Sequence, residues 1–132
     1  MIKVNVKSRK NPIDSSVKYY MNICPVTYLK LEQIAKNISD RCTVTEPDVL
    51  AVLNSLQTEV IKAMQNGQSV RLGQLGSFRP TISSKGVANK ADADTSLIKA
   101  VRSRFTMGSR LRSALALSNE DVKFGLEQNA SN

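Results

Sequence analysis

The stretch 70–80 constrains the fold of this chain most strongly, because its pattern predicts a tight β-hairpin. Residues 70–72 and 78–82 both alternate between apolar and other side chains, as strands with one apolar face do. Between these runs, Gly73 and Gly76 bracket two residues. Glycine accepts the left-handed backbone that a tight reversal requires. The chain on either side of this hairpin must therefore supply elements that cover its apolar face.

Two helices are predicted before the hairpin. Apolar residues in 28–40 recur at the spacing of one helix face. The second helix begins more clearly, since Thr45 can cap it, Pro47 suits its first turn, and Asp48 stands where a capping box places an acidic partner. Its apolar spacing continues to Asn66-Gly67, a stop signal. Two helices with one apolar face each need another layer, and the hairpin can provide it.

Strands are also expected at the beginning of the chain. Residues 2–7 alternate cleanly, 8–12 break the pattern with an Asn-Pro turn, and 17–23 form a second candidate strand. The nearby Arg9-Lys10 pair fits either a solvated turn or a DNA contact. These observations predict a β extension over residues 1–26, ahead of a main domain at 27–126 and a flexible tail at 127–132.

After the hairpin, the sequence predicts a two-stranded ribbon. Residues 79–85 place polar side chains at every second position, and Pro80 restricts this strand to a sheet edge or a bulge. Residues 86–96 have the composition of a mobile loop or arm tip, and 97–105 return as a strand. Gly108-Ser109 then begins a short helix, and 122–124 are a candidate last strand.

Positive charge is concentrated in the ribbon and its surroundings. The chain has 19 Lys and Arg against 11 Asp and Glu, a net charge of +8. Residues 71–112 have nine of these basic residues and only Asp92 and Asp94 as acidic ones, whereas residues 27–70 are close to neutral. Lysines that only maintain solubility would be scattered, so this distribution indicates a surface that binds a polyanion.

No constellation typical of an enzyme is present. The chain lacks His, the commonest general base, and has no phosphate-binding glycine motif. Cys24 and Cys42 do not have metal-ligand spacing, so we expect reduced thiols, no metal, no cofactor and no small-molecule substrate. No apolar run approaches the ~20 residues of a membrane span, and the first residues do not form a signal peptide.

A basic β-ribbon fits a DNA groove, where Lys and Arg neutralise phosphates and Arg can enter a narrow minor groove. No array of Asn, Gln and Arg is aimed at base edges, so we expect weak sequence specificity and affinity dominated by counterion release. The alternative is that the arginines only keep an exposed hairpin in solution. The candidate DNA-binding residues are Arg79, Thr81, Ser83, Lys85, Lys90, Lys99, Arg102, Arg104, Arg110 and Arg112.

Residues 28–117 resemble the HU/IHF superfamily of bacterial nucleoid proteins. The similarity lies in Gly67-Gln68-Ser69-Val70-Arg71-Leu72 followed by Leu75-Gly76-Ser77-Phe78, and in Phe105, Gly108, Leu111 and Arg112 near the end. The extra N-terminal segment, with its Arg-Lys-Asn-Pro and Tyr19-Tyr20, is similar to the longer HU-like variants of the Bacteroidetes group.

This resemblance implies an α+β fold: two N-terminal helices under a β-sheet with a protruding two-stranded β-arm, then a short C-terminal helix. It also implies an intertwined homodimer whose arms clasp the minor groove of bent double-stranded DNA in the cytoplasm, at the bacterial nucleoid. Two departures stand out. Thr81 and Ser83 replace arginines of the first arm strand, and the arm tip at 86–96 lacks the family's wedging proline.

Two other functions are compatible with these residues. The missing wedge, together with the two aspartates of the tip, is compatible with an HU-like protein-interaction module that has reduced or no DNA binding. RNA binding would need exposed aromatic side chains for stacking, and only Tyr19 and Tyr20 are candidates.

Overall fold

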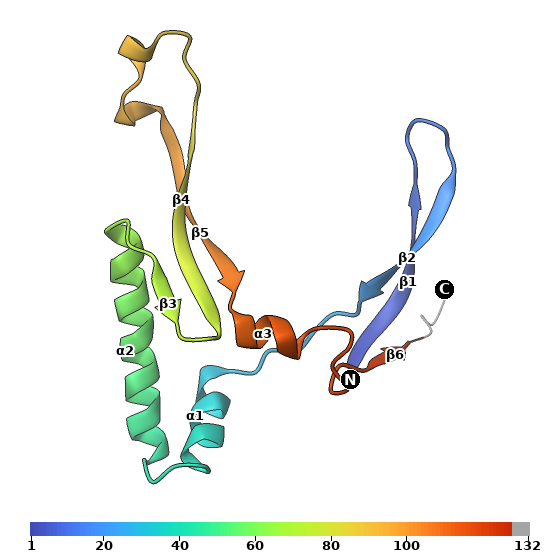
Figure 1. Ribbon diagram of the computed structural model, residues 1–132, viewed down its shortest axis with the longest axis vertical. Coiled ribbons are helices and arrows are strands. Elements are labelled where there is room, and N and C mark those ends of the chain that lie inside the picture. Colours follow the sequence, from blue (N-terminus) through green and yellow to red (C-terminus); the bar gives the residue numbers. More distant parts are fainter. Residues whose placement is uncertain (128–132) are drawn as a thin grey trace. The chain divides into compact units, whose positions relative to one another are not determined.

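The protein has an α+β fold, which a computed structural model describes for residues 1–127 (Figure 1). Within these residues there are three α-helices and two three-stranded sheets. The chain forms two compact units. One combines Met1–Leu29 with the chain from Ser113 onward, and the other is Lys30–Arg112. Of the tail predicted at 127–132, all but the first residue lies outside the described residues.

The first unit is a sheet in the order β2-β1-β6. Strand β1 (Ile2–Lys10) pairs antiparallel with β2 (Val17–Ile23), and β6 (Phe124–Leu126) pairs parallel with β1. The prediction for β2 is confirmed at both ends. The predicted break at residues 8–12 is wrong, because β1 continues to Lys10, which pairs with Val17.

A short turn closes the β1–β2 hairpin. The Asn11 side chain accepts a hydrogen bond from the Ile13 N–H at 2.9 Å, and Asp14 accepts from the N–H and the hydroxyl of Ser16 at 2.9 and 2.7 Å. Ser15 adopts a left-handed φ of 60°. These Asx-type bonds satisfy the turn locally, so β1 can pair with β2 up to Lys10, the last residue before the turn.

The C-terminal strand lies in the first unit, whereas the sequence grouped residues up to 126 with the main domain. The Glu127 N–H donates to the Val4 carbonyl at 2.8 Å, and its carboxylate pairs with Lys3 at 3.1 Å. This ion pair holds the pKa of Glu127 below its ordinary value. Glu127, the first residue of the predicted tail, is thus bonded to β1.

The second unit begins with helices α1 (Leu31–Ser39) and α2 (Glu46–Gln65). The Thr45 cap of α2 is confirmed: its hydroxyl oxygen accepts from the Asp48 N–H at 3.4 Å, while the hydroxyl donates to the Asp48 carboxylate at 2.8 Å. Helix α1 has no side-chain cap and begins three residues later than predicted, at Leu31.

The second sheet has the order β3-β4-β5, with β3 (Val70–Leu72), β4 (Gly76–Ser84) and β5 (Ile98–Met107). The predicted hairpin is confirmed, because Gly73 has a left-handed φ of 55° and the Leu75 N–H closes the turn onto Leu72. Helix α2 packs on this hairpin.

Beyond β3, strands β4 and β5 continue as a two-stranded ribbon that extends past the end of α2 (Figure 1). The loop at its tip, predicted at 86–96 as a mobile loop or arm tip, contains two 3₁₀ turns, Lys90–Asp92 and Thr95–Leu97. Pro80 lies just past the end of β3, where one side of β4 has no neighbouring strand within the described chain. This edge position is the one predicted for a residue without an N–H.

Helix α3 (Ser109–Ala114) begins as predicted, after Gly108. A Cβ added at Gly108 would lie 2.7 Å from the Gln74 carbonyl carbon and even closer to its oxygen, both of them backbone atoms. We therefore expect Gly108→Ala to lower the free energy of unfolding by roughly 2–4 kcal/mol in a denaturant titration. Gly86→Ala is the matched control, since a Cβ there meets nothing within 4 Å. An equal effect of both changes would contradict the close approach.

Candidate nucleic-acid interface

The register of the ribbon brings three arginines onto one face. Arg79 lies directly opposite Arg104, and Thr81 lies opposite Arg102. Alternate residues of a strand share a face, so Arg79, Arg102 and Arg104 point to the same side of the ribbon. All three are exposed. The sequence predicted this shared face for the first strand, and the pairing adds the arginines of the second.

The opposite face of the ribbon is apolar and faces the helical layer at its base. Phe78 is paired with Phe105 across the strands, and their ring centroids are 5.2 Å apart. Two residues before Phe105 in β5, and on this face, the Ser103 hydroxyl contacts the Met64 sulfur of α2 at 3.5 Å. The arginine face is therefore turned away from α2 and toward solvent.

Arg71 belongs to the same face, although it was not among the predicted site residues. It lies in β3 opposite Ser77, which is two residues before Arg79 and therefore on the same side of β4. A sequence signal for this placement was present, because residues 70–72 alternate and Arg71 is the polar residue between two apolar ones. From here on, Arg71, Arg79, Arg102 and Arg104 are called the ribbon arginines.

The ribbon arginines repel one another, and no acidic side chain compensates for them in the described structure. Like charges directly opposite each other destabilise a sheet, and Arg79 and Arg104 are such a pair. Within residues 1–127, the only ion pair with a distance of 4 Å or less is Lys3–Glu127, in the other unit. A bound polyanion would remove this repulsion, which is the electrostatic property expected of a phosphate-binding surface.

The other predicted residues are distributed more widely. The Thr81 hydroxyl donates to the Arg102 carbonyl at 3.4 Å, so it is already bonded to the ribbon backbone. Lys99 lies at a register irregularity, since Ser83 pairs with Ala100 and Ser84 with Ile98. Lys85 directly follows β4, Lys90 begins the first 3₁₀ turn, and Arg110 and Arg112 lie in α3.

The ribbon tip has a local negative charge. The Asp94 carboxylate accepts hydrogen bonds from the hydroxyl and the N–H of Ser96, and these bonds lower the pKa of Asp94 below its ordinary value. Asp94 therefore stays ionised at neutral pH. The cationic surface is centred on the ribbon arginines and not on the tip.

Residues 1–127 contain no group of three or more His, Cys, Asp or Glu side chains that could hold a metal ion. No helix in this range is long and apolar enough to cross a membrane.

The second unit thus combines a basic β-ribbon with a pair of helices. Residues 1–120 match the model of the HU-HIG family, described as an HU domain fused to wHTH, Ig or a glycine-rich motif. The match spans most of the chain, so this protein belongs to that HU-like family. The resemblance predicted from the hairpin and from the residues around Phe105 is confirmed at this level.

Thirteen chains of solved structures are similar to this fold. One is the crystal structure of a candidate bacterial DNA-binding protein from Bacteroides vulgatus ATCC 8482, with a TM-score of 0.63 and 17% sequence identity. The alignment covers 95% of this chain and 48% of the other, so this chain spans about half the length of that protein. A comparison with curated proteins gave no match.

Proposed function

We propose that this protein is an architectural, weakly sequence-specific double-stranded DNA-binding protein of the bacterial nucleoid. The observation that carries this proposal is the face of four arginines, which has no acidic partner within the described residues. Guanidinium groups bind phosphate as planar forks with several donors, and a two-stranded ribbon fits a DNA groove. Membership of the HU-like family supports the same partner.

The proposed binding is of low sequence specificity. Recognition of base edges relies on side chains such as Asn, Gln and Arg aimed at defined atoms, and Thr81 and Ser83 flank the arginines here instead. The tip at residues 86–96 contains no Pro, Phe, Leu, Ile or Met that could act as a wedge, and its Asp94 is ionised. We therefore propose that the ribbon grips the phosphate backbone and bends DNA without inserting a side chain between base pairs.

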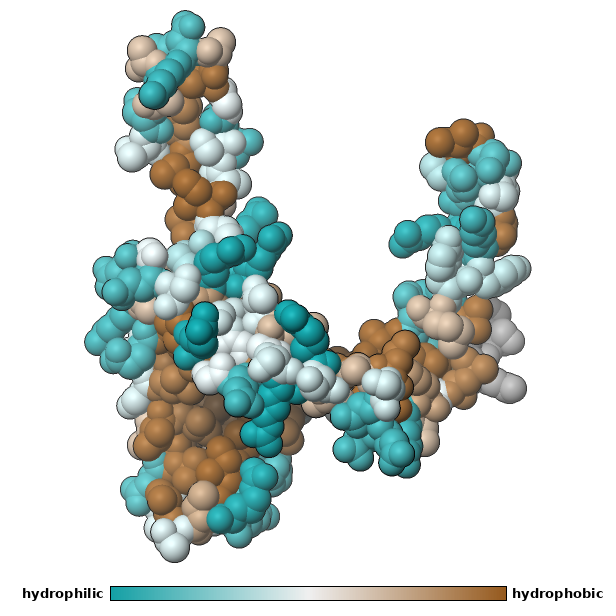
Figure 2. Space-filling model, viewed as in Figure 1, coloured by the Kyte–Doolittle hydropathy of each residue, from teal (hydrophilic) through white to brown (hydrophobic). Residues whose placement is uncertain are grey.

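The protein is proposed to act as a homodimer, and exposed apolar residues of the second unit support this. Among the described residues, only Ala35 and Val49 in this unit are buried hydrophobic side chains. Leu56, Ile61 and Phe78 line an apolar pocket of ≈ 300 Å³ on α2 and the hairpin. Figure 2 shows apolar side chains gathered over the helical part of this unit. A second copy would cover a surface of this kind.

A salt-dependent DNA titration tests the proposal. We expect fluorescence anisotropy to show binding to duplexes of about 21 base pairs, or two helical turns, with little difference between sequences. With about six phosphates contacted by the dimer, the logarithm of the association constant should fall against log salt with a slope of roughly −5.

No binding at 50 mM salt would refute the proposal. In that case, the HU-like protein-interaction module, with its exposed apolar surface, would become the better explanation of this fold. A complex with a protein partner that survives high salt would then be the expected finding.

A further inference from the structure

We propose that the β1–β2 hairpin of the first unit is a second DNA-contacting ribbon, which binds duplex phosphates through Lys7, Arg9 and Lys18. This inference rests on the proposed function and adds a second contact surface to it. The β1–β2 hairpin belongs to a different sheet from the one that contains the ribbon arginines. The two units are linked in the chain at residues 29–30 and 112–113.

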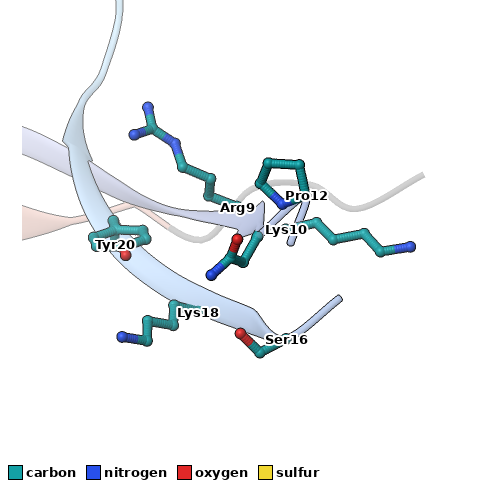
Figure 3. A pocket seen from close by; sticks show the side chains of 7 residues that line it. Arg9, Lys10, Pro12, Ser16, Lys18 and Tyr20 are labelled. Atoms are coloured by element: carbon teal, nitrogen blue, oxygen red, sulfur yellow. The ribbon is translucent and has the colours of Figure 1, made fainter. Parts of the chain in front are cut away.

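The register of the hairpin separates its side chains into two faces. Arg9 lies directly opposite Lys18, and Lys7 lies opposite Tyr20, so these four share one face. The other face is mostly apolar, with Val6 opposite Met21. Figure 3 shows the Arg9 and Lys10 side chains pointing in different directions, as neighbouring residues of a strand do. The hairpin thus concentrates its cations on one side.

This cationic face has the same electrostatic property as the ribbon arginines. Arg9 and Lys18 are directly opposed like charges, and Lys7 lies on the same face two residues along β1 from Arg9. The acidic residue of the hairpin, Asp14, is in the turn and bonds the N–H and the hydroxyl of Ser16. Within residues 1–127, no ion pair involves the three cations. Their mutual repulsion would be relieved by an external polyanion.

The hairpin also forms an open recess suited to a phosphate. A pocket of ≈ 220 Å³ lies between Arg9, Lys18 and Tyr20, and Ser16 also lines it (Figure 3). Cationic and hydroxyl donors around one recess are the groups that contact phosphate oxygens in protein–DNA complexes.

The aromatic side chains favour duplex DNA over single strands. The Arg9 guanidinium carbon lies 5.9 Å from the centroid of the Tyr20 ring, within cation–π distance, and Tyr20 remains 48% exposed. Tyr19 pairs with Ser8 and therefore lies on the opposite face. Single-strand binding uses successive bases stacked on open aromatic rings. The cationic face of the hairpin has a single ring, Tyr20, so it offers no row of rings on which successive bases could stack.

The test compares charge-removing variants in the full chain. Lys7→Gln, Arg9→Gln and Lys18→Gln are combined, and the matched control combines Lys30→Gln, Lys36→Gln and Lys62→Gln, which are exposed in or next to the helices. Affinity for a duplex of about 30 base pairs, or three helical turns, is measured by anisotropy from 0.05 to 0.3 M salt. Circular dichroism and a thermal melt check that each variant is folded.

If each hairpin of the dimer neutralises one phosphate, the triple variant should show a slope shallower by about 1.8 and a Kd about 30-fold higher at 0.15 M salt. A charge-conserving variant, Lys7→Arg with Arg9→Lys and Lys18→Arg, should bind like the wild type. The Kd of the control variant should stay within about threefold of the wild-type value, since none of its three lysines belongs to a proposed DNA contact.

Each other outcome is decisive. If the hairpin variant keeps the wild-type affinity and slope while the wild type binds DNA, the second ribbon is refuted and the proposed function stands. If the control variant loses as much as the hairpin variant, the effect comes from net charge and the inference is also refuted. If the wild type itself does not bind duplex at 50 mM salt, the proposed function has failed, and this inference fails with it.

Discussion

Replacing all four ribbon arginines by glutamine is expected to raise the Kd for duplex DNA by about 1,000-fold at 0.15 M salt and to make the salt slope shallower by about 3.6. These figures assume that the two ribbons of a dimer together neutralise four phosphates. The arginines are exposed and make no ion pair within the described residues, so their removal breaks no internal bond of that kind. Anisotropy titrations at several salt concentrations measure both quantities.

Two controls separate the loss of binding from unfolding and from net charge. Removing the like-charged pair of Arg79 and Arg104 should leave the melting temperature unchanged or raise it. Neutralising four exposed cations of the helical part, Lys30, Lys36, Arg41 and Lys62, removes the same charge from another surface. We expect this second variant to bind much like the wild type. A ribbon variant that binds as tightly as this control would remove the ribbon from the mechanism.

Local chemistry explains why much of this fold was predictable from sequence. Thr45 and Gly73 specify a helix cap and a tight turn, and each acts over a few residues. The alternation at 17–23 gave β2 with both ends correct. In such places the sequence signal lies within the element that it predicts, so a single stretch of sequence is sufficient to predict that element.

Features that depend on distant partners were less predictable. Strand β1 extends to Lys10 because its residues from Val4 to Lys10 pair with β2, although the alternation of β1 stops earlier. Strand β6 lies beside β1 in parallel, and nothing near Phe124 in the sequence indicates this partner. The grouping of the C-terminal residues with the first unit follows from that pairing.

The candidate site also combines features that local sequence predicts with features that depend on the pairing of distant strands. The shared face of Arg79, Arg102 and Arg104 follows from period-two alternation combined with a hairpin. Arg71 joins them only through the pairing of β3 with β4, and Lys99 drops out of the regular ladder through a one-residue irregularity in pairing. Both features depend on the register of strand pairing. An alternating sequence pattern alone does not exclude a register shifted by one residue.

A charge placed in the apolar pocket of α2 is expected to break up the proposed dimer. Ile61 is 56% exposed in the single chain, so Ile61→Asp should cost a monomeric fold little. In a dimer that covers this pocket, the aspartate would be buried without a partner, at a cost of at least about 3 kcal/mol. We expect the dimer to dissociate at least about 100-fold more readily, with a clear fall in melting temperature.

A charge at a second position on the same helix separates disruption of a dimer from a general effect of added charge on α2. Ser55→Asp adds the same charge to the same helix on the face away from the pocket, at 3.6 residues per turn, and should leave a dimer intact. Sedimentation equilibrium distinguishes the 14.5 kDa chain from its dimer. A wild type that remains at the single-chain mass, with both variants equally stable, would refute the dimer. Loss of DNA binding in the Ile61 variant alone would further indicate that two ribbons must act together, because one ribbon contacts too few phosphates to bind at physiological salt.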